Sequence, residues 1–180
     1  MSEVTKFSAI YDVFLTKVTD DMYMEMTELD TYKLLQELLI SAIPWFEFPR
    51  KDLNDYEVEE IVSVDTYSGV LSDGAEVPAY IYSNGHFNNK LTIEEINILA
   101  TYMVAEWVGQ QLASIENTRQ KFSGTDFKFT SQANHMGKLK EIKADFTQKG
   151  FHLQRLYKRR KIDENGNVVS TLGSIMEGVD

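Results

Sequence analysis

Two segments near the N-terminus place apolar residues on one face of a helix. In the first, they recur at the i, i+3, i+4, i+7 spacing of an amphipathic helix expected from about Thr5 to Lys17. These positions are Phe7, Ile10, Tyr11, Phe14, Leu15 and Val18. A second helix is expected to begin at Thr27, whose hydroxyl can cap it with Asp30 three residues on. It should end or bend near Ile43, because Pro44 follows.

The strongest helical pattern lies in the second half of the chain. Thr92 with Glu95 three residues later forms a capping box, and apolar residues then recur at helical spacing from Ile96 to Leu112. Another helix is expected from a cap at Ser131, with Met136, Leu139, Ile142, Phe146, Leu153 and Leu156 on one side. Gly150 costs this helix ~1 kcal/mol relative to Ala, which favours a bend or break there.

The segment between these two helices has a different pattern. Residues 114–135 read SIENTRQKFSGTDFKFTSQANH, with three Phe among polar residues and no apolar periodicity. We therefore expect a joint that interrupts the helices. It either folds onto the core as an ordered loop or lies at a contact with another chain.

Residues 58–83 have strand-like composition. They are rich in Val, Ile, Tyr and Thr, and Asp73-Gly74 is a hairpin turn signal. The pattern predicts an inserted β-hairpin with 61–71 paired to 76–82, and Pro78 at an edge of the ladder. Since an isolated two-stranded ribbon is marginal in water, it should rest on the helical body or on another chain.

These elements predict a mainly α fold. We expect a small bundle of about four to five helices over residues 1–161, with the β-hairpin inserted at about 58–83. Residues 162–180 have a turn at Asn165-Gly166 and scattered apolar residues, which is typical of an extended tail that orders on a partner. At 180 residues, the chain can bury a core without a cofactor.

Composition excludes several classes of site. The chain has no Cys, which removes disulfides, thiolate metal sites and thiol nucleophiles. Its longest apolar cluster, at 38–46, is far shorter than the ~20 residues of a membrane helix, and the N-terminus lacks an apolar signal segment. We therefore expect a soluble protein that makes no membrane contact and stays inside the cell that makes it.

The net charge of -10 is distributed unevenly along the chain. Residues 1–100 carry 19 acidic and 6 basic side chains, whereas 101–180 carry 9 acidic and 12 basic ones. Within 121–161 there are 11 Lys and Arg against 3 acids. A positive segment can attract phosphate or an acidic neighbour, and the acidic half of an identical copy would be such a neighbour.

Catalytic and metal-binding motifs are missing from the sequence. It has no phosphate-binding loop, no HExxH and no GxSxG. The three histidines, His86, His135 and His152, are too widely spaced for local metal ligation, so we expect no metal and no cofactor. Glu106 is the one acid inside an apolar helix, and pairing with a Lys or Arg of the next helix is favoured over a catalytic role.

The order of these parts resembles the head-tail connector (neck adaptor) proteins of tailed bacteriophages. The residues that carry the resemblance are the N-terminal amphipathic helix, the FNNKLTIEEINILATYMVAEWV helix, the joint at 114–135, the Lys-rich helix after it, and LQRLYKRRKI before a short tail. The likeness runs from about residue 5 to the tail and is densest from Phe87 to Ile162. The inserted hairpin is an addition relative to leaner helical members.

The resemblance implies a structural protein of the virion neck, made in the host bacterial cytoplasm, with no enzyme activity. It implies a ring, usually of twelve copies, between the portal protein and a tail-side neck or tail completion protein. Genomic DNA would pass through the lumen without sequence-specific binding. An acidic lumen would let DNA slide, whereas a basic one would hold phosphates, so the acidic half is expected on the channel wall.

Two sets of residues become candidate contact sites under this resemblance. The first would lie at the boundary between subunits, where aromatic anchors and charges are typical; it comprises Phe122, Phe127, Phe129, Arg155, Lys158, Arg159, Arg160 and Lys161. The second resembles the portal-gripping tail of the family and would order on binding. Its members are Ile162, Val168, Val169, Leu172, Ile175 and Met176.

Two other functions remain open from the residues alone. The basic segment 121–161 is compatible with a small DNA-binding regulator, although the acidic first half would repel the same phosphates. A carboxylate site near Glu106 and His135 would make the protein an enzyme instead. For the basic cluster at 155–161, a solvated helix end is the alternative to a partner contact.

Overall fold

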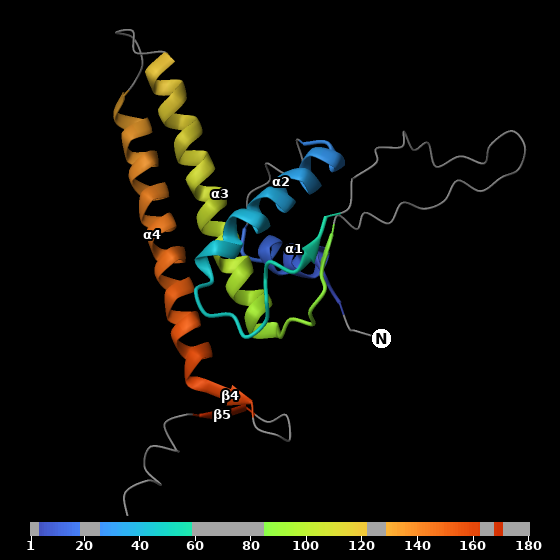
Figure 1. Cartoon of the computed structure of the whole chain (residues 1–180). Coiled ribbons are helices and arrows are strands. Elements are labelled where there is room, and N and C mark those ends of the chain that lie inside the picture. Colours follow the sequence, from blue (N-terminus) through green and yellow to red (C-terminus); the bar gives the residue numbers. More distant parts are fainter. Residues whose placement is uncertain (1–3, 19–25, 59–84, 122–128, 163–167, 171–180) are drawn as a thin grey trace, which may run out of the picture.

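The helices and five short strands of the described chain form a mainly helical body, shown in Figure 1 as a computed structural model. The structure describes residues 4–18, 26–58, 85–121, 129–162 and 168–170, with the backbone alone at 28–29, 118–121, 129–133, 161–162 and 168–170. Four α-helices lie within these residues. The predicted fold class, a small helical bundle with an inserted β-hairpin, is confirmed.

The first two helices follow their predicted caps and stops. Helix α1 spans Phe7–Leu15, and is shorter than expected because Thr5–Lys6 forms strand β1 instead. Helix α2 spans Glu28–Ala42, and the hydroxyl of Thr27 accepts a hydrogen bond from the Asp30 amide at 3.2 Å, as predicted. The chain then turns through a short 3₁₀ helix, η2 (Ile43–Trp45), which contains the proline that stops α2.

A small antiparallel sheet closes one end of the body. Strand β3 (His86–Phe87) lies between β1 and β2 (Tyr56–Glu57), with Phe87 opposite both Thr5 and Tyr56. Strands β2 and β3 flank the predicted insertion and pair with each other, whereas the strands predicted at 61–71 and 76–82 lie outside the described residues. Gly85 has φ of +140°, and a Cβ there would lie 2.6 Å from the Glu57 carbonyl oxygen.

The two longest helices pair antiparallel and extend beyond the rest of the body (Figure 1). Helix α3 spans Ile93–Lys121 and α4 spans Phe129–Arg159. The prediction of a non-helical joint over 114–135 is wrong at both ends, because helix continues through Lys121 and resumes at Phe129, before the expected cap at Ser131. The polar sequence remains helical because α3 and α4 lie alongside each other, and most helical stability in proteins comes from such tertiary packing rather than from the local pattern.

Facing residues of α3 and α4 repeat every seven positions. Three contacts share one register: the Tyr157 hydroxyl with the Glu95 carboxylate, Tyr102 with Gly150, and Lys143 with Gly109. A Cβ at Gly150 would lie 2.5 Å from the Tyr102 ring, and one at Gly109 would lie 2.8 Å from Lys143 Nζ. The prediction of a bend or break at Gly150 is therefore not met, since α4 runs through it and the glycine provides room for a ring.

Helix α3 is central to the core, as its apolar length predicts. Its buried face packs against α1, α2 and α4, with Leu99, Met103 and Val108 almost inaccessible to water. On α4, Met136 is buried and Leu139, Phe146 and Leu153 pack against the core, whereas Ile142, expected on the same side, is exposed. The bundle thus leaves one face of α4 open to solvent.

A second pair of strands follows α4 directly. Strand β4 (Arg160–Ile162) and strand β5 (Val168–Ser170) are antiparallel, with Ile162 opposite Val168. The predicted turn at Asn165-Gly166 falls between the strands but lies outside the described residues. Figure 1 shows this hairpin at the end of the α3–α4 pair where α3 begins and α4 ends.

Candidate functional site

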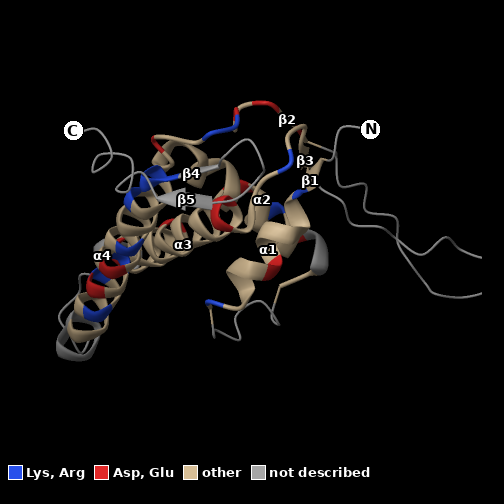
Figure 2. Cartoon of the chain, turned by 90° about the horizontal axis from the view of Figure 1, so that it is seen from below, with Lys and Arg blue, Asp and Glu red and all other residues tan. Residues whose placement is uncertain are grey.

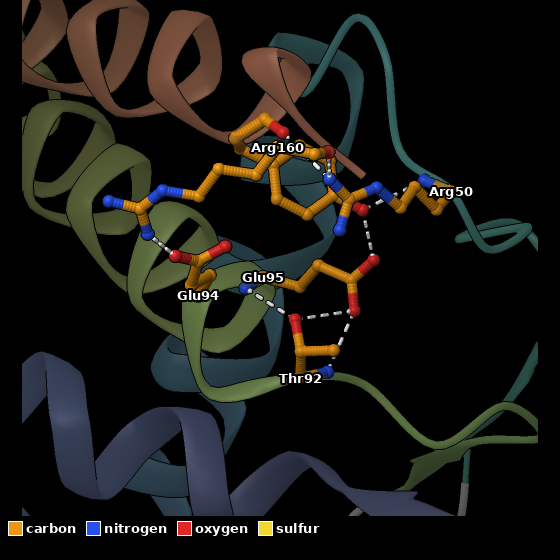
Figure 3. A network of polar contacts seen from close by, with 6 residues as sticks. Arg50, Thr92, Glu94, Glu95 and Arg160 are labelled. Carbon is orange, nitrogen blue, oxygen red and sulfur yellow. Dashed lines mark hydrogen bonds and ion pairs between the residues drawn. The ribbon is translucent and has the colours of Figure 1, made fainter. Parts of the chain in front are cut away.

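A buried polar network joins the start of α3 to the end of α4 (Figure 3). The Glu95 carboxylate accepts hydrogen bonds from the Thr92 amide at 2.7 Å, from the Thr92 hydroxyl at 3.0 Å and from the Tyr157 hydroxyl. The Glu95 amide in turn donates to the Thr92 hydroxyl at 3.3 Å, which completes the predicted capping box. Glu95 is only 1% exposed, so these donors are what makes its burial tolerable.

Arginines extend this network to the surface. The Arg50 guanidinium stacks 4.1 Å from the centre of the Tyr157 ring and donates to the Tyr157 carbonyl at 2.7 Å and to the Arg160 carbonyl. The Arg160 side chain forms an ion pair with Glu94 at the start of α3. The last turn of α4 and the first residue of β4 are thereby fixed to the body.

Burial raises the pKa of Tyr157 well above its usual range, and its hydrogen bond to Glu95 acts in the same direction. A neutral hydroxyl can donate to Glu95 while it accepts a hydrogen bond from the Arg50 amide at 3.0 Å. The network therefore works with Tyr157 protonated.

A second polar cluster fixes the chain after α2 against α3 and α4. Gln154 is buried, donates to the Trp45 carbonyl at 2.7 Å and to the Tyr102 hydroxyl, and accepts from the Glu47 amide at 3.0 Å. The Trp45 ring stacks on Tyr102 with 6.0 Å between centroids. Its indole Nε1 donates to Glu106 at 2.7 Å. Among the described residues Glu106 thus contacts a tryptophan, and the Lys or Arg expected from the sequence does not pair with it.

The solvent-facing side of this cluster is an aromatic groove. We use this name for two adjoining hollows, of about 500 and 370 Å³, that share Phe151. The residues that line them are Trp45, Glu47, Phe48, Leu112, Lys140, Lys143, Ala144, Thr147, Gln148, Phe151, Gln154, Arg155 and Lys158. Trp45 is 38%, Phe48 53% and Phe151 37% exposed, although all three are large and apolar.

Basic side chains surround these rings. Lys158 Nζ lies 4.2 Å from the centre of the Phe48 ring, and Lys143 Nζ lies beside Gly109. Figure 2 shows Lys and Arg spread along α4 and at its junction with β4, with acids interspersed on the same helix. The groove can therefore offer apolar contact and positive charge to the same ligand.

The predicted interface cations are brought near one another but serve different contacts. Arg155 and Lys158 line the groove, whereas Arg160 pairs with Glu94. Arg159 is exposed in the last turn of α4, and Lys161 lies in β4, where its backbone alone is described.

The aromatic and tail candidates are described only in part. Phe129 is the first residue of α4, and Phe122 and Phe127 lie outside the described residues. Ile162, Val168 and Val169 lie in the β4–β5 hairpin. The remaining tail candidates, Leu172, Ile175 and Met176, lie outside the described residues.

The residues considered for catalysis are not brought together. His135 is exposed near the start of α4. In the α3–α4 register Glu106 faces the level of Phe146, so His135 lies about 16 Å further along the pair. In the part of the chain that the structure describes, no group of His, Asp and Glu is arranged to hold a metal ion, and no helix is long and apolar enough to span a membrane.

Sequence reasoning missed the aromatic side of the groove and the Arg50 contact. Trp45 and Phe48 lie just after the proline that ends α2, and Phe151 lies off the apolar stripe of α4. Apolar residues that lie outside an apolar stripe are the signal in the sequence that could have indicated this groove. However, the residues on its two sides are more than 100 positions apart in the chain, and their contact depends on tertiary packing.

Comparison of the chain with models of protein families, with curated proteins and with solved structures finds no match in any of the three.

Proposed function

We propose that this protein is a structural head-tail connector of a tailed bacteriophage, a subunit of a closed ring between the portal protein and a tail-side neck or tail completion protein. The proposal starts from the resemblance carried by residues 5 to the tail. It gives the chain no enzyme activity and locates it in the virion neck. The usual family ring has twelve copies.

The observation that carries the proposal is the fixed base of the C-terminal hairpin. Arg50 holds the carbonyls of Tyr157 and Arg160, and Glu94 holds the Arg160 side chain. Such an anchor lowers the entropic cost of binding a partner through the tail, since only the residues beyond the anchor become ordered on binding. The contacts of this network support a tail that leaves the body from a defined point.

The hairpin itself also favours a partner. It has three residue pairs between β4 and β5, and an isolated two-stranded ribbon is marginally stable in water. Its edges can pair with a strand of another chain, which is a common mode of peptide recognition. We therefore keep Ile162, Val168, Val169, Leu172, Ile175 and Met176 as the proposed portal-binding residues.

Charge supports the orientation of the ring. Exposed acids of the first half include Asp12, Glu37, Asp52, Asp55 and Glu57, and we propose that this half contributes to the channel wall. Repulsion between this wall and phosphates would leave DNA free to slide. The cations of α4 would face a neighbouring subunit or the portal, together with the proposed boundary residues Phe122, Phe127 and Phe129.

Electron microscopy of the chain mixed with portal complexes of the virus that encodes it tests the proposal. We expect an added ring on the portal with the full chain, and none with a chain truncated after Lys161. A chain truncated after Ser170 keeps both strands of the hairpin and separates their contribution from that of the last ten residues.

Three outcomes would contradict the proposal. One is the absence of an added ring with the full chain, and another is an unaltered ring with the chain truncated after Lys161. The third is tight, steeply salt-dependent binding of duplex DNA through α4, which would favour the regulator instead.

A further inference from the structure

The aromatic groove has the properties of a docking surface rather than of ordinary exposed side chains. Trp45, Phe48 and Phe151 are neighbours, and each keeps more than a third of its surface in contact with water. Single exposed apolar residues are common, but a cluster of three rings rimmed by polar groups marks an interaction site. Trp45 is also held in place, since its indole donates to Glu106 and its ring stacks on Tyr102.

The charge of the groove defines the chemistry of its ligand. Four cations line it, Lys140, Lys143, Arg155 and Lys158, against one lining acid, Glu47. Lys140 also lies 4.0 Å from Glu116, an exposed pair that competes weakly for this charge. A fitting ligand therefore carries carboxylates together with apolar or aromatic side chains.

We propose that this groove binds the acidic insertion, residues 59–84, of a second copy of this chain. That segment contains five Asp or Glu and no Lys or Arg, together with seven Val, Ile or Leu and three Tyr. It therefore combines negative charge with apolar side chains. Tyrosines and branched aliphatic residues would contact the rings while carboxylates meet the four cations.

The position of the two surfaces favours a contact between copies. The insertion joins the body at Val58 and Gly85, which directly follow β2 and directly precede β3 of the β1–β3–β2 sheet. Figures 1 and 2 both show this sheet on the side of the body away from α4, with α1 and α2 between them. Two complementary surfaces on opposite sides of one protomer produce a head-to-tail contact, and such a contact can close into a ring.

This inference deepens the proposed function. It rests on that function because the choice of a second copy as the partner follows from the proposed ring. It identifies one side of the ring contact, with Trp45, Phe48 and Phe151 added to the two cations, Arg155 and Lys158, already proposed there. The insertion then has a structural purpose, because it connects neighbouring subunits.

The test is a titration of a fluorescently labelled peptide of residues 58–85 with the full chain. We expect saturable binding that weakens as salt is raised, because the contact is partly ionic. The double variant Phe48→Ser with Lys158→Glu should weaken binding about tenfold or more, since it removes an anchor ring and reverses a charge. Both side chains are exposed, so the variant should remain folded, which circular dichroism checks.

The matched control is Lys138→Glu. Lys138 is an exposed lysine of α4 outside the groove, so this variant makes the same charge change on the same helix and should bind the peptide as tightly as the unaltered chain. Equal loss of binding in this control would indicate a non-specific charge effect and would overturn the proposal.

Two further results would overturn it. One is a peptide that does not bind the full chain, or that binds the double variant as well as the unaltered one. The other is a single-stranded oligonucleotide that displaces the peptide and depends on the same residues, since aromatic rings with cations also suit stacked bases. The titration contains no portal, so a ring seen on portals without peptide binding would refute the groove assignment and leave the proposed function standing.

Discussion

The ring of Tyr102 on α3 lies in the space that a Cβ atom at Gly150 on α4 would occupy. A Cβ built at Gly150 would lie 2.5 Å from two carbon atoms of that ring. Tyr102 is itself buried, stacked against Trp45 and bonded to Gln154, so it has little room to move. The glycine therefore serves helix packing at this position.

Gly150→Ala should destabilise the protein, although alanine is the better helix former by ~1 kcal/mol. Overpacking against Tyr102 should cost about 1–3 kcal/mol and outweigh that gain. Urea unfolding followed by circular dichroism measures the difference. Gly137→Ala is the control in the same helix, because nothing lies within 4 Å of a Cβ there, and it should stabilise the protein.

Tyr157→Phe should lower the free energy of unfolding by about 1–3 kcal/mol at neutral pH. The change removes one of the donors to the buried Glu95 carboxylate and the acceptor of the Arg50 amide. Urea unfolding would measure the loss. A variant as stable as the unaltered chain would show that the network contributes no net stability.

The same residue predicts a dependence on alkaline pH. The pKa of Tyr157 is raised in the folded chain, so the folded state keeps a proton that the unfolded state loses above about pH 10. Its stabilising contribution is fully present below that pH and is lost as the pH rises toward the folded value. Unfolding measured from pH 8 to 11 should therefore show a steeper loss for the unaltered chain than for Tyr157→Phe.

Arg50→Lys should loosen the hairpin more than it destabilises the bundle. Lysine keeps the charge but loses the planar guanidinium that stacks on Tyr157 and reaches two carbonyls. Hydrogen exchange read by mass spectrometry should show faster exchange in β4 and β5, with α3 unchanged. Lys51→Arg, the exposed neighbour, should leave both rates as they are.

Glu106→Gln should change stability by less than about 1 kcal/mol, because an amide oxygen can still accept from Trp45 Nε1. Ring assembly on portals should also be unchanged. Glu106→Leu should cost more, since it leaves the indole donor without this acceptor. Loss of a catalytic activity in the glutamine variant would contradict the structural role proposed for this carboxylate.

The parts of the fold set by neighbouring residues could be predicted from the sequence. Thr27 and Thr92 cap helices because their hydroxyls act within three residues, and Pro44 ends α2 because it lacks an amide proton. The helical state of 114–121 depends instead on α4 lying alongside, and no local pattern reports such a neighbour.

The candidate site was predictable only on its charged side. The cations at 155–161 are evident in the sequence, whereas the rings that they surround come from η2, the residues after it and an off-stripe position of α4. Arg50 meets Tyr157 across 107 positions of chain. Such contacts follow from how the bundle packs, and a helical periodicity carries no information about them.

The glycine pairings of α3 and α4 have a mechanical consequence. Sliding one helix along the other would drive the buried Tyr102 ring into a residue with a side chain, whereas the flexible end of Lys143 beside Gly109 could move aside. Shear between the helices is therefore opposed at the level of Tyr102 and Gly150. A force applied to the chain beyond Arg160 would therefore be transmitted along the helix pair, which is about 45 Å long, without the two helices sliding past each other.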